Sequence, residues 1–267
     1  MEITVNSHPT YVYTGGKNLS PADLAGQPAV VFIHGAQQDH SCWSLQSRWF
    51  AHHGRSVIAP DLPGHGRSGG VPLTSVEALA DWIVALLDAL GIARATLVGH
   101  SMGSLVAMET ALAHPTRVER AALIGTALPM PVSEPLLDAA QNNEAKAAAM
   151  INAFSYSPEG QMGGNTVPGL WLLGVNRRLM ERQKPGVFHT DLAACNAYLR
   201  PLASLAGIAA PTLVVSGERD RMTAPKMARE IAATIPGARL ASIADSGHAL
   251  MAERPDAVLD ALAAFIP

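Results

Sequence analysis

The stretch Ala95-Thr96-Leu97-Val98-Gly99-His100-Ser101-Met102-Gly103 decides the fold class of this 267-residue chain. Its first four residues form a short apolar run, which predicts a strand buried on both faces of a sheet. The residues after it predict a helix over Gly103–His114, which ends at Pro115. The pattern G-x-S-x-G between a strand and a helix is typical of a tight turn that lifts a serine above the sheet.

The two glycines of this pattern have a steric cause. Ser101 must adopt a strained backbone conformation at the apex of the turn, and side chains two residues before and after it would collide. Gly99 and Gly103 remove those side chains. The turn also leaves the N–H of Met102 unpaired at a helix N-terminus, where it can bind an oxyanion. We therefore predict Ser101 as a nucleophile and Met102 as an oxyanion donor.

Apolar runs on either side of this turn predict the rest of the sheet. Because strands and helices alternate, they indicate an α/β fold with a doubly wound, mostly parallel sheet. The predicted strands are Pro28–Ile33, Ser56–Ala59, Ala121–Ile124, Thr212–Ser216 and Leu240–Ile243, with Ile3–Tyr13 as an opening hairpin. The predicted helices of this layer are Trp43–His52, Ser75–Leu90, Pro225–Thr234 and Pro255–Phe265.

One long stretch, between Ala127 and Ala210, contains no convincing buried strand. A structureless loop of this length would be unusual in a compact domain. We expect a helical cap over residues 128–208, inserted into a core made of residues 1–127 and 209–267. The expected helices are Glu134–Phe154, Gly169–Gln183 and Asp191–Leu199, with a loop over Ser155–Thr166.

A serine hydroxyl needs a base to remove its proton, and His248 is the predicted base. It lies in Ser246-Gly247-His248, after the last strand, while Asp220 follows the preceding strand. Because neighbouring parallel strands end at one edge, Asp220 is expected to hold the imidazole of His248. Glu218 and Asp245 are the alternatives for this acid, and we favour Asp220.

The loop that follows the first buried strand, His34-Gly35-Ala36, is expected to supply the second oxyanion donor. We choose the N–H of Ala36, with that of Gln37 as the alternative. His34 is expected to hydrogen-bond loop backbone. The loop Asp61–Ser68 is predicted to pack beside the serine turn, with His65 as a loop anchor.

The predicted cap offers apolar side chains for an acyl pocket, although packing within the cap explains them equally well. They are Phe154, Trp171, Met150 and Met162. The two cysteines, Cys42 and Cys195, lack metal-ligand spacing and are interpreted as packed thiols. We therefore predict neither a metal site nor a disulfide.

Composition excludes several classes of protein. Hydrophobic residues make up 48% and charged residues 15%, below the roughly 25% of ordinary domains, so the chain is not disordered. A net charge of −3 argues against binding to nucleic acid. No apolar run approaches the roughly 18–20 residues of a membrane span. Without a visible signal peptide, we expect a cytoplasmic protein.

Taken together, the motifs resemble those of the α/β-hydrolase superfamily. They are His34-Gly35, the loop Asp61–Ser68, Gly99–Gly103, Gly217–Asp220 and Ser246-Gly247-His248, and the tail Gly247–Pro255 is also similar. The resemblance covers the chain outside the cap region. It implies a serine hydrolase without a cofactor, with a cap after the sixth strand of the family's sheet.

Departures from particular branches narrow this resemblance. Ser101 stands where haloalkane dehalogenases and epoxide hydrolases carry aspartate, and Ala249 where carbon–carbon bond hydrolases usually carry tryptophan. His34–Gln38 departs from the H-G-G-P-G of proline iminopeptidases, and cofactor-free perhydrolases usually lack so large a cap. We expect a carboxylesterase, thioesterase or lactonase for a small or medium acyl substrate. An acyltransferase, a carbon–carbon bond hydrolase and a non-enzymatic small-molecule receptor are the alternatives.

Overall fold

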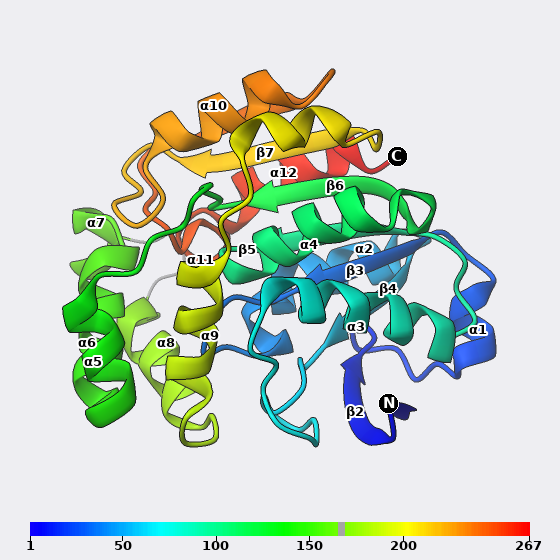
Figure 1. The fold of residues 1–267 in the computed structure, drawn as a ribbon, viewed down its shortest axis with the longest axis horizontal. Helices are drawn as coiled ribbons and strands as arrows, with labels where there is room; N and C mark the ends of the chain where they lie inside the picture. The colour runs from blue at the N-terminus through cyan, green and yellow to red at the C-terminus, as the bar shows by residue number, and fades with distance from the viewer. Residues whose placement is uncertain (165–168) are drawn as a thin grey trace.

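The computed structural model describes residues 1–164 and 169–267, which form a mostly parallel sheet between two layers of helices (Figure 1). Within these residues the strand order is β1-β2-β4-β3-β5-β6-β7-β8, and only the β1–β2 and β2–β4 pairs are antiparallel. The predicted doubly wound α/β fold is confirmed. The strands are β1 (Glu2–Val5), β2 (His8–Tyr13), β3 (Ala29–Ile33), β4 (Ser56–Pro60), β5 (Ala95–His100), β6 (Val118–Ile124), β7 (Thr212–Gly217) and β8 (Arg239–Ile243).

The central strands are largely apolar because helices cover both of their faces. In β3, Val31 and Ile33 join one hydrophobic core, whereas Val30 and Phe32 join the other. Helices α1 (Pro21–Ala25), α3 (Val76–Ala89), α4 (Met102–Ala113) and α10 (Pro225–Thr234) pack in the first core. Helices α2 (Ser44–His52), α11 (Leu250–Glu253) and α12 (Pro255–Phe265) pack in the second. Among the described residues no helix combines the length and apolarity that a bilayer crossing needs.

The register of the parallel strands brings their carboxyl ends together. Ile33 of β3 lies opposite Gly99 of β5, and Gly217 of β7 lies opposite Ile243 of β8. The loops that follow β3, β5, β7 and β8 therefore leave the sheet at a single edge. This is the edge at which open α/β sheets bind their ligands.

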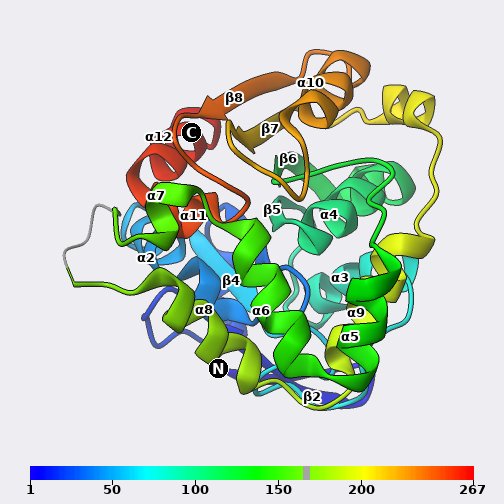
Figure 2. The same cartoon turned by 90° about the vertical axis from the view of Figure 1, so that its left-hand side faces the viewer.

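Helices between β6 and β7 gather beyond this edge, on the left in Figure 1 and in front of the sheet in Figure 2. They share a small apolar core that includes Ala140, Ala147, Phe188 and Leu192. These helices are α5 (Glu134–Asn142), α6 (Glu144–Ser155), α7 (Pro158–Gln161), α8 (Leu172–Glu181) and α9 (Val187–Ala197).

Local structure in this segment differs from the prediction in two places. The expected single helix over Glu134–Phe154 is wrong, because Asn143 breaks it and its side chain accepts the N–H of Lys146 at 3.1 Å, which caps α6. Helix α7 lies in the stretch predicted as a loop, Ser155–Thr166, whose last two residues are outside the described residues.

The chain returns from α9 to β7 along the surface of α4. Tyr198 and Leu205 are buried in the same core as α4, and a 3₁₀ helix spans Leu202–Gly207. The hydroxyl of Tyr198 donates to Glu109 Oε2 at 2.6 Å, and Arg200 also pairs with Glu109. This return segment therefore packs with α4 against the sheet, and its Tyr198 and Leu205 lie outside the small apolar core of helices α5–α9.

Candidate active site

Ser101 lies at the apex of a turn between β5 and α4. Its φ of 52° and ψ of −119° place a non-glycine residue in a strained region of backbone space. A Cβ on Gly99 would approach the main chain of Gly103 closer than 3.0 Å, and a Cβ on Gly103 would approach Ile33 as closely. The strain at Ser101 and the packing of β3, β5 and α4 thus require both glycines.

His248 and Asp220 form a buried pair on the loops after β8 and β7. Nδ1 of His248 lies 2.9 Å from Oδ2 of Asp220, and each residue is 4% exposed. Thr223 Oγ1 donates to the same Oδ2 at 2.6 Å and lies 3.2 Å from Nδ1. The N–H groups of Met222 and Thr223 each donate to Oδ1 of Asp220 at 2.8 Å.

These contacts keep Asp220 ionised. Burial on its own would raise the pKa of Asp220, but His248 and the hydrogen bonds from Thr223 more than offset burial and lower it. The alternative acids lie elsewhere: Glu218 accepts from Ser242, and Asp245 pairs with Arg219 on the surface.

Ser101 and His248 line one cavity of about 330 Å³, together with Ala36 and Thr223. The other walls are mainly apolar and come from the segment after β6 and from α5, α6 and α9. They include Met130, Leu136, Met150, Ile151, Phe154 and Leu192. The cavity therefore brings a serine hydroxyl, an imidazole and an apolar wall into one space.

The backbone around this cavity provides two free donors. Within the described part of the chain, the N–H groups of Ala36 and Met102 make no hydrogen bond to protein. The N–H of Gln37, in contrast, donates to Asp191 Oδ2 at 2.8 Å. The alternative oxyanion donor suggested by the sequence is therefore engaged elsewhere.

Of the four predicted pocket residues, the structure brings only two to Ser101. Met150 and Phe154 line its cavity. Trp171 lines a separate cavity of about 700 Å³, which also contains His100 and Gln38. Met162 follows α7 and is 87% exposed. Neither Trp171 nor Met162 lines the Ser101 cavity, so their expected roles in an acyl pocket stay predictions.

Buried histidines surround the serine turn. Nδ1 of His34 lies 2.9 Å from Gly35 O, and its Nε2 accepts the N–H of Leu62 at 3.1 Å, so His34 holds loop backbone. His100, which the sequence reasoning missed, places Nε2 at 2.9 Å from the main-chain oxygen of His248. Burial lowers the pKa of His34 to about 4 and that of His100 to about 3. The position of His100 directly before Ser101 is the sequence feature that could have indicated its place beside the site.

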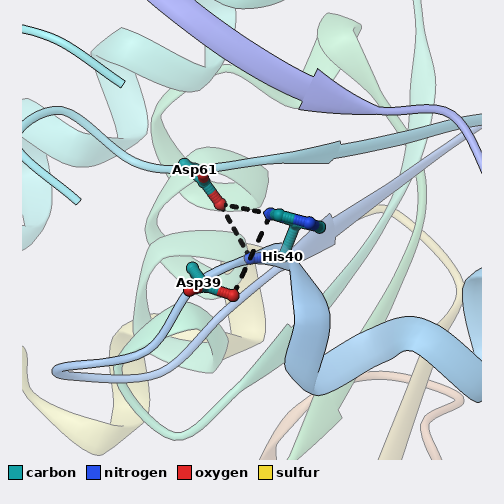
Figure 3. A group of neighbouring side chains, drawn as sticks. All are labelled: Asp39, His40 and Asp61. Carbon is teal, nitrogen blue, oxygen red and sulfur yellow. Dashed lines mark hydrogen bonds and ion pairs between the residues drawn. The ribbon is translucent and has the colours of Figure 1, made fainter. Parts of the chain in front are cut away.

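Asp39, His40 and Asp61 form a cluster with the spacing of metal ligands (Figure 3). Their acceptor oxygens are already engaged. Asp61 accepts the backbone and ring nitrogens of His40 at 2.9 and 2.7 Å, and the N–H of Arg67 at 2.9 Å. Asp39 pairs with Arg182 through two hydrogen bonds of 2.8 and 2.7 Å. The cluster is therefore satisfied by protein donors, and a cation would have to displace them.

Comparison with known proteins identifies the family. Residues 30–261 match the profile of the alpha/beta hydrolase family. The chain belongs to the α/β-hydrolase family. It is 30% identical to the dihydrolipoyllysine-residue acetyltransferase component of the acetoin cleaving system of Pseudomonas putida, with 97% of this chain and 69% of that protein covered.

Solved structures of this family share the whole fold. An enzyme that degrades N-acyl homoserine lactones is 28% identical with a TM-score of 0.85, and the match covers 100% of both chains. The enol-lactonase of Burkholderia xenovorans LB400 is 25% identical with a TM-score of 0.87, covering 100% of this chain and 99% of that one. The helices between β6 and β7 are thus included in the match.

Proposed function

We propose that this α/β-hydrolase cleaves carboxylic esters, linear or cyclic, through an acyl-enzyme on Ser101. The observation that carries the proposal is the buried His248–Asp220 pair, with 2.9 Å between Nδ1 and Oδ2, beside the cavity that Ser101 also lines. A strained serine, an oriented imidazole and an ionised carboxylate are the parts of a serine hydrolase. The lactone-cleaving enzymes among the similar structures support the same chemistry.

In the first half of the proposed reaction, Ser101 attacks the ester carbonyl while Nε2 of His248 takes its proton. Asp220 fixes the ring through Nδ1 and stabilises the imidazolium. The N–H groups of Ala36 and Met102 would hold the oxyanion, since both are free. Each such donor contributes on the order of 3–4 kcal/mol to transition-state stabilisation.

To complete the first half, His248 gives its proton to the oxygen of the leaving alcohol, and the bond from that oxygen to the acyl carbon breaks, which leaves the acyl group on Ser101 Oγ. In the second half, His248 removes a proton from water. The water attacks the acyl carbon, the bond to Ser101 Oγ breaks, and His248 reprotonates the serine. A lactone follows the same path, except that its alcohol stays attached to the acyl group. These steps use only the side chains and backbone named above, the ester and water.

The proposed cap, residues 128–208, would select the acyl group. Met150 and Phe154 of α6 and Leu192 of α9 supply apolar walls to a cavity of about 330 Å³. That volume is at the small end of ligand pockets. It favours small to medium apolar acyl groups, as proposed from the sequence, and thioesters of such acids fit the same space.

The test is a panel of aryl esters of graded acyl length, with thioesters and γ- and δ-lactones, assayed against the wild type and Ser101→Ala. We expect hydrolysis with a maximum at one acyl length, and a loss of at least about 10⁴-fold in kcat for Ser101→Ala. Circular dichroism checks that the variant is folded. Full activity in folded Ser101→Ala would refute the proposed nucleophile.

Acyl transfer is the second candidate, because the Pseudomonas putida relative is an acetyltransferase component. An alcohol or thiol would then replace water in the second half of the reaction. Product analysis with graded concentrations of an added thiol distinguishes the two. If the protein is an acyltransferase, the acylated thiol should be the main product at millimolar thiol. If it is a hydrolase, the free acid should be the main product.

A further inference from the structure

A second acid–histidine pair lies buried next to the proposed site. His65 follows β4, in the loop Asp61–Ser68, whereas Asp191 belongs to α9. Nε2 of His65 lies 2.8 Å from Oδ2 of Asp191, and both side chains are 1% exposed. The proposed reaction uses neither residue. A buried charged pair of this kind is costly unless its hydrogen bonds are complete, so its role needs an explanation.

The contacts of His65 define its protonation. Its Nδ1 lies 3.0 Å from the carbonyl oxygen of Pro63, which can only accept a hydrogen bond. Its Nε2 faces Asp191 Oδ2, an oxygen that also accepts the N–H of Gln37 at 2.8 Å. Both ring nitrogens of His65 therefore carry protons, and the ring is an imidazolium.

The charges around His65 agree with this protonation. Asp191 faces it from α9, Asp61 lies at the end of β4, and the uncharged ring of His34 packs at 4.9 Å between centroids. Burial lowers the pKa of His65, but Asp191 and the hydrogen bonds overcome burial and raise it above the usual value.

Asp191 connects this pair to the oxyanion donor. The residue it holds, Gln37, is 2% exposed and has a φ of 56°, a left-handed conformation that costs energy in any residue except glycine. The side chain of Gln37 donates to Met180 O at 3.1 Å, at the end of α8. Ala36, directly before it, lines the cavity of Ser101. Two helices of the proposed cap thus fix the strained residue next to the oxyanion donor.

We propose that Asp191, held in place by protonated His65, is a positioning residue that aims the Ala36 N–H at the oxyanion. This inference rests on the proposed ester hydrolysis. In this scheme the loop after β3 supplies the Ala36 donor of the oxyanion hole, and Asp191 of α9 positions it. Neither Asp191 nor His65 touches the substrate, and their effect passes through the backbone of Gln37.

The kinetic signature follows from this role. An oxyanion donor acts on the transition state, so its loss lowers kcat more than it raises KM. Deprotonation of His65 removes its positive charge and one of its two hydrogen bonds, so the ion pair with Asp191 is intact below the raised pKa of His65 and is lost as pH rises through it. Wild-type kcat should therefore fall on the alkaline side.

The experiment compares Asp191→Asn and His65→Gln with Lys184→Met as the matched control. Lys184 Nζ donates to Ser68 O at 2.7 Å and so joins the same two segments without touching Gln37. We expect a kcat loss of about 10²-fold for Asp191→Asn with KM changed less than about threefold, since removing an oxyanion donor costs about 10²–10³ in kcat. His65→Gln should lose the alkaline limb, and Lys184→Met should behave as wild type.

A measurement without substrate separates this inference from the proposed function. In the wild type, nitrogen-15 NMR of the His65 ring should show both N–H protons at pH 7. In Asp191→Asn, the ring should no longer carry both protons at that pH. A neutral His65 ring at pH 7, or equal kcat in Asp191→Asn and Lys184→Met, would overturn the positioning role. Absence of esterase activity in the wild type would instead contradict the proposed function. The NMR result would then still show whether His65 is protonated by its contact with Asp191.

Discussion

Nε2 of His100 lies 2.9 Å from the main-chain oxygen of His248, so the residue before the proposed nucleophile holds the proposed base. The two imidazole rings pack at 4.8 Å between centroids. Because His100 accompanies Ser101 in the same turn, this contact couples the position of the nucleophile to that of the base across two loops of the sheet edge.

We expect His100→Phe to lower kcat about tenfold, because the carbonyl of His248 loses its buried donor and the ring of His248 shifts. His100→Gln, whose amide can donate to the same oxygen, should retain most of the activity. Steady-state kinetics with an aryl ester measure both variants. Equal losses in the two would show that packing, and not the hydrogen bond, matters at this position.

Acid should destabilise the protein through its buried neutral histidines. His34 and His100 have folded pKa values of about 4 and about 3, against 6.5 when exposed, so the unfolded chain binds more protons between pH 4 and 6.5. Their stabilisation is therefore complete above pH 6.5 and falls with pH by up to ~2.7 kcal/mol per pH unit for the two residues. Urea unfolding at several pH values measures this slope, and His100→Gln should roughly halve it.

The glycines of the serine turn should not tolerate a methyl group. A Cβ on Gly99 would lie closer than 3.0 Å to backbone atoms of Gly103 and Ser104, which cannot move without separating β5 from α4. We expect Gly99→Ala to lose at least about 3 kcal/mol of stability or to fail to fold. Gly26→Ala is the control, since Gly26 has a φ of −81° and its nearest contact is at 3.6 Å. A Gly99→Ala variant as stable as Gly26→Ala would contradict the steric argument.

Glu253 should be sensitive to the loss of its charge. Its buried carboxylate accepts the N–H of Gly247 at 2.8 Å, and the N–H and hydroxyl of Ser157 at 2.9 and 2.6 Å. Glu253→Gln replaces one carboxylate oxygen by an NH₂ group, which then faces the N–H of Gly247 or the N–H and hydroxyl of Ser157. We expect a stability loss of about 3 kcal/mol and a lower kcat, since Gly247 precedes His248.

Thermal and urea unfolding measure the loss of stability. Glu230→Gln is the control, because Glu230 is only partly buried and its partner Lys226 is exposed. Unchanged stability in Glu253→Gln would show that Ser157 and Gly247 find other acceptors.

The walls of the Ser101 cavity should set the acyl length. Met150→Trp adds bulk to a cavity of about 330 Å³ and should reduce kcat/KM for hexanoyl and longer esters more than for acetyl esters. The shift is measured as the ratio of the two values. Trp171→Ala, outside this cavity, should leave the ratio unchanged. If Trp171→Ala shifts the ratio and Met150→Trp does not, the acyl group binds in the larger cavity.

The centre of the sheet could be predicted from the sequence because strands such as β3, β4 and β5 are buried on both faces. Ala29–Ile33 and Ala95–Val98 are short, mainly apolar runs bounded by turn residues, which is typical of buried strands. The contact between Asp220 and His248 could be anticipated for a related reason, since the order of parallel strands determines which loops meet.

The segment after β6 could not be predicted in the same way. Phe154 and Trp171 look alike in a helical pattern, and only the packing of α6 and α8 separates the one that lines the Ser101 cavity from the one that does not. Asp191 meets His65 from a distant part of the chain, and no local pattern marks that pairing. Asn143 ends one helix and caps the next. The alanine-rich sequence on both sides favours a continuous helix, so the break was not predicted.

The burial of Tyr198 and Leu205 in the core that contains α4 has a consequence for recombining this protein with its relatives. A transplant that replaces residues 128–208 as a block would remove the aromatic hydroxyl that contacts Glu109 and the leucine beneath it, and so would damage the host. A transplant whose second junction falls at residue 197 leaves those side chains in the recipient. The exchangeable unit for changing specificity is therefore shorter than the stretch that lacks strands.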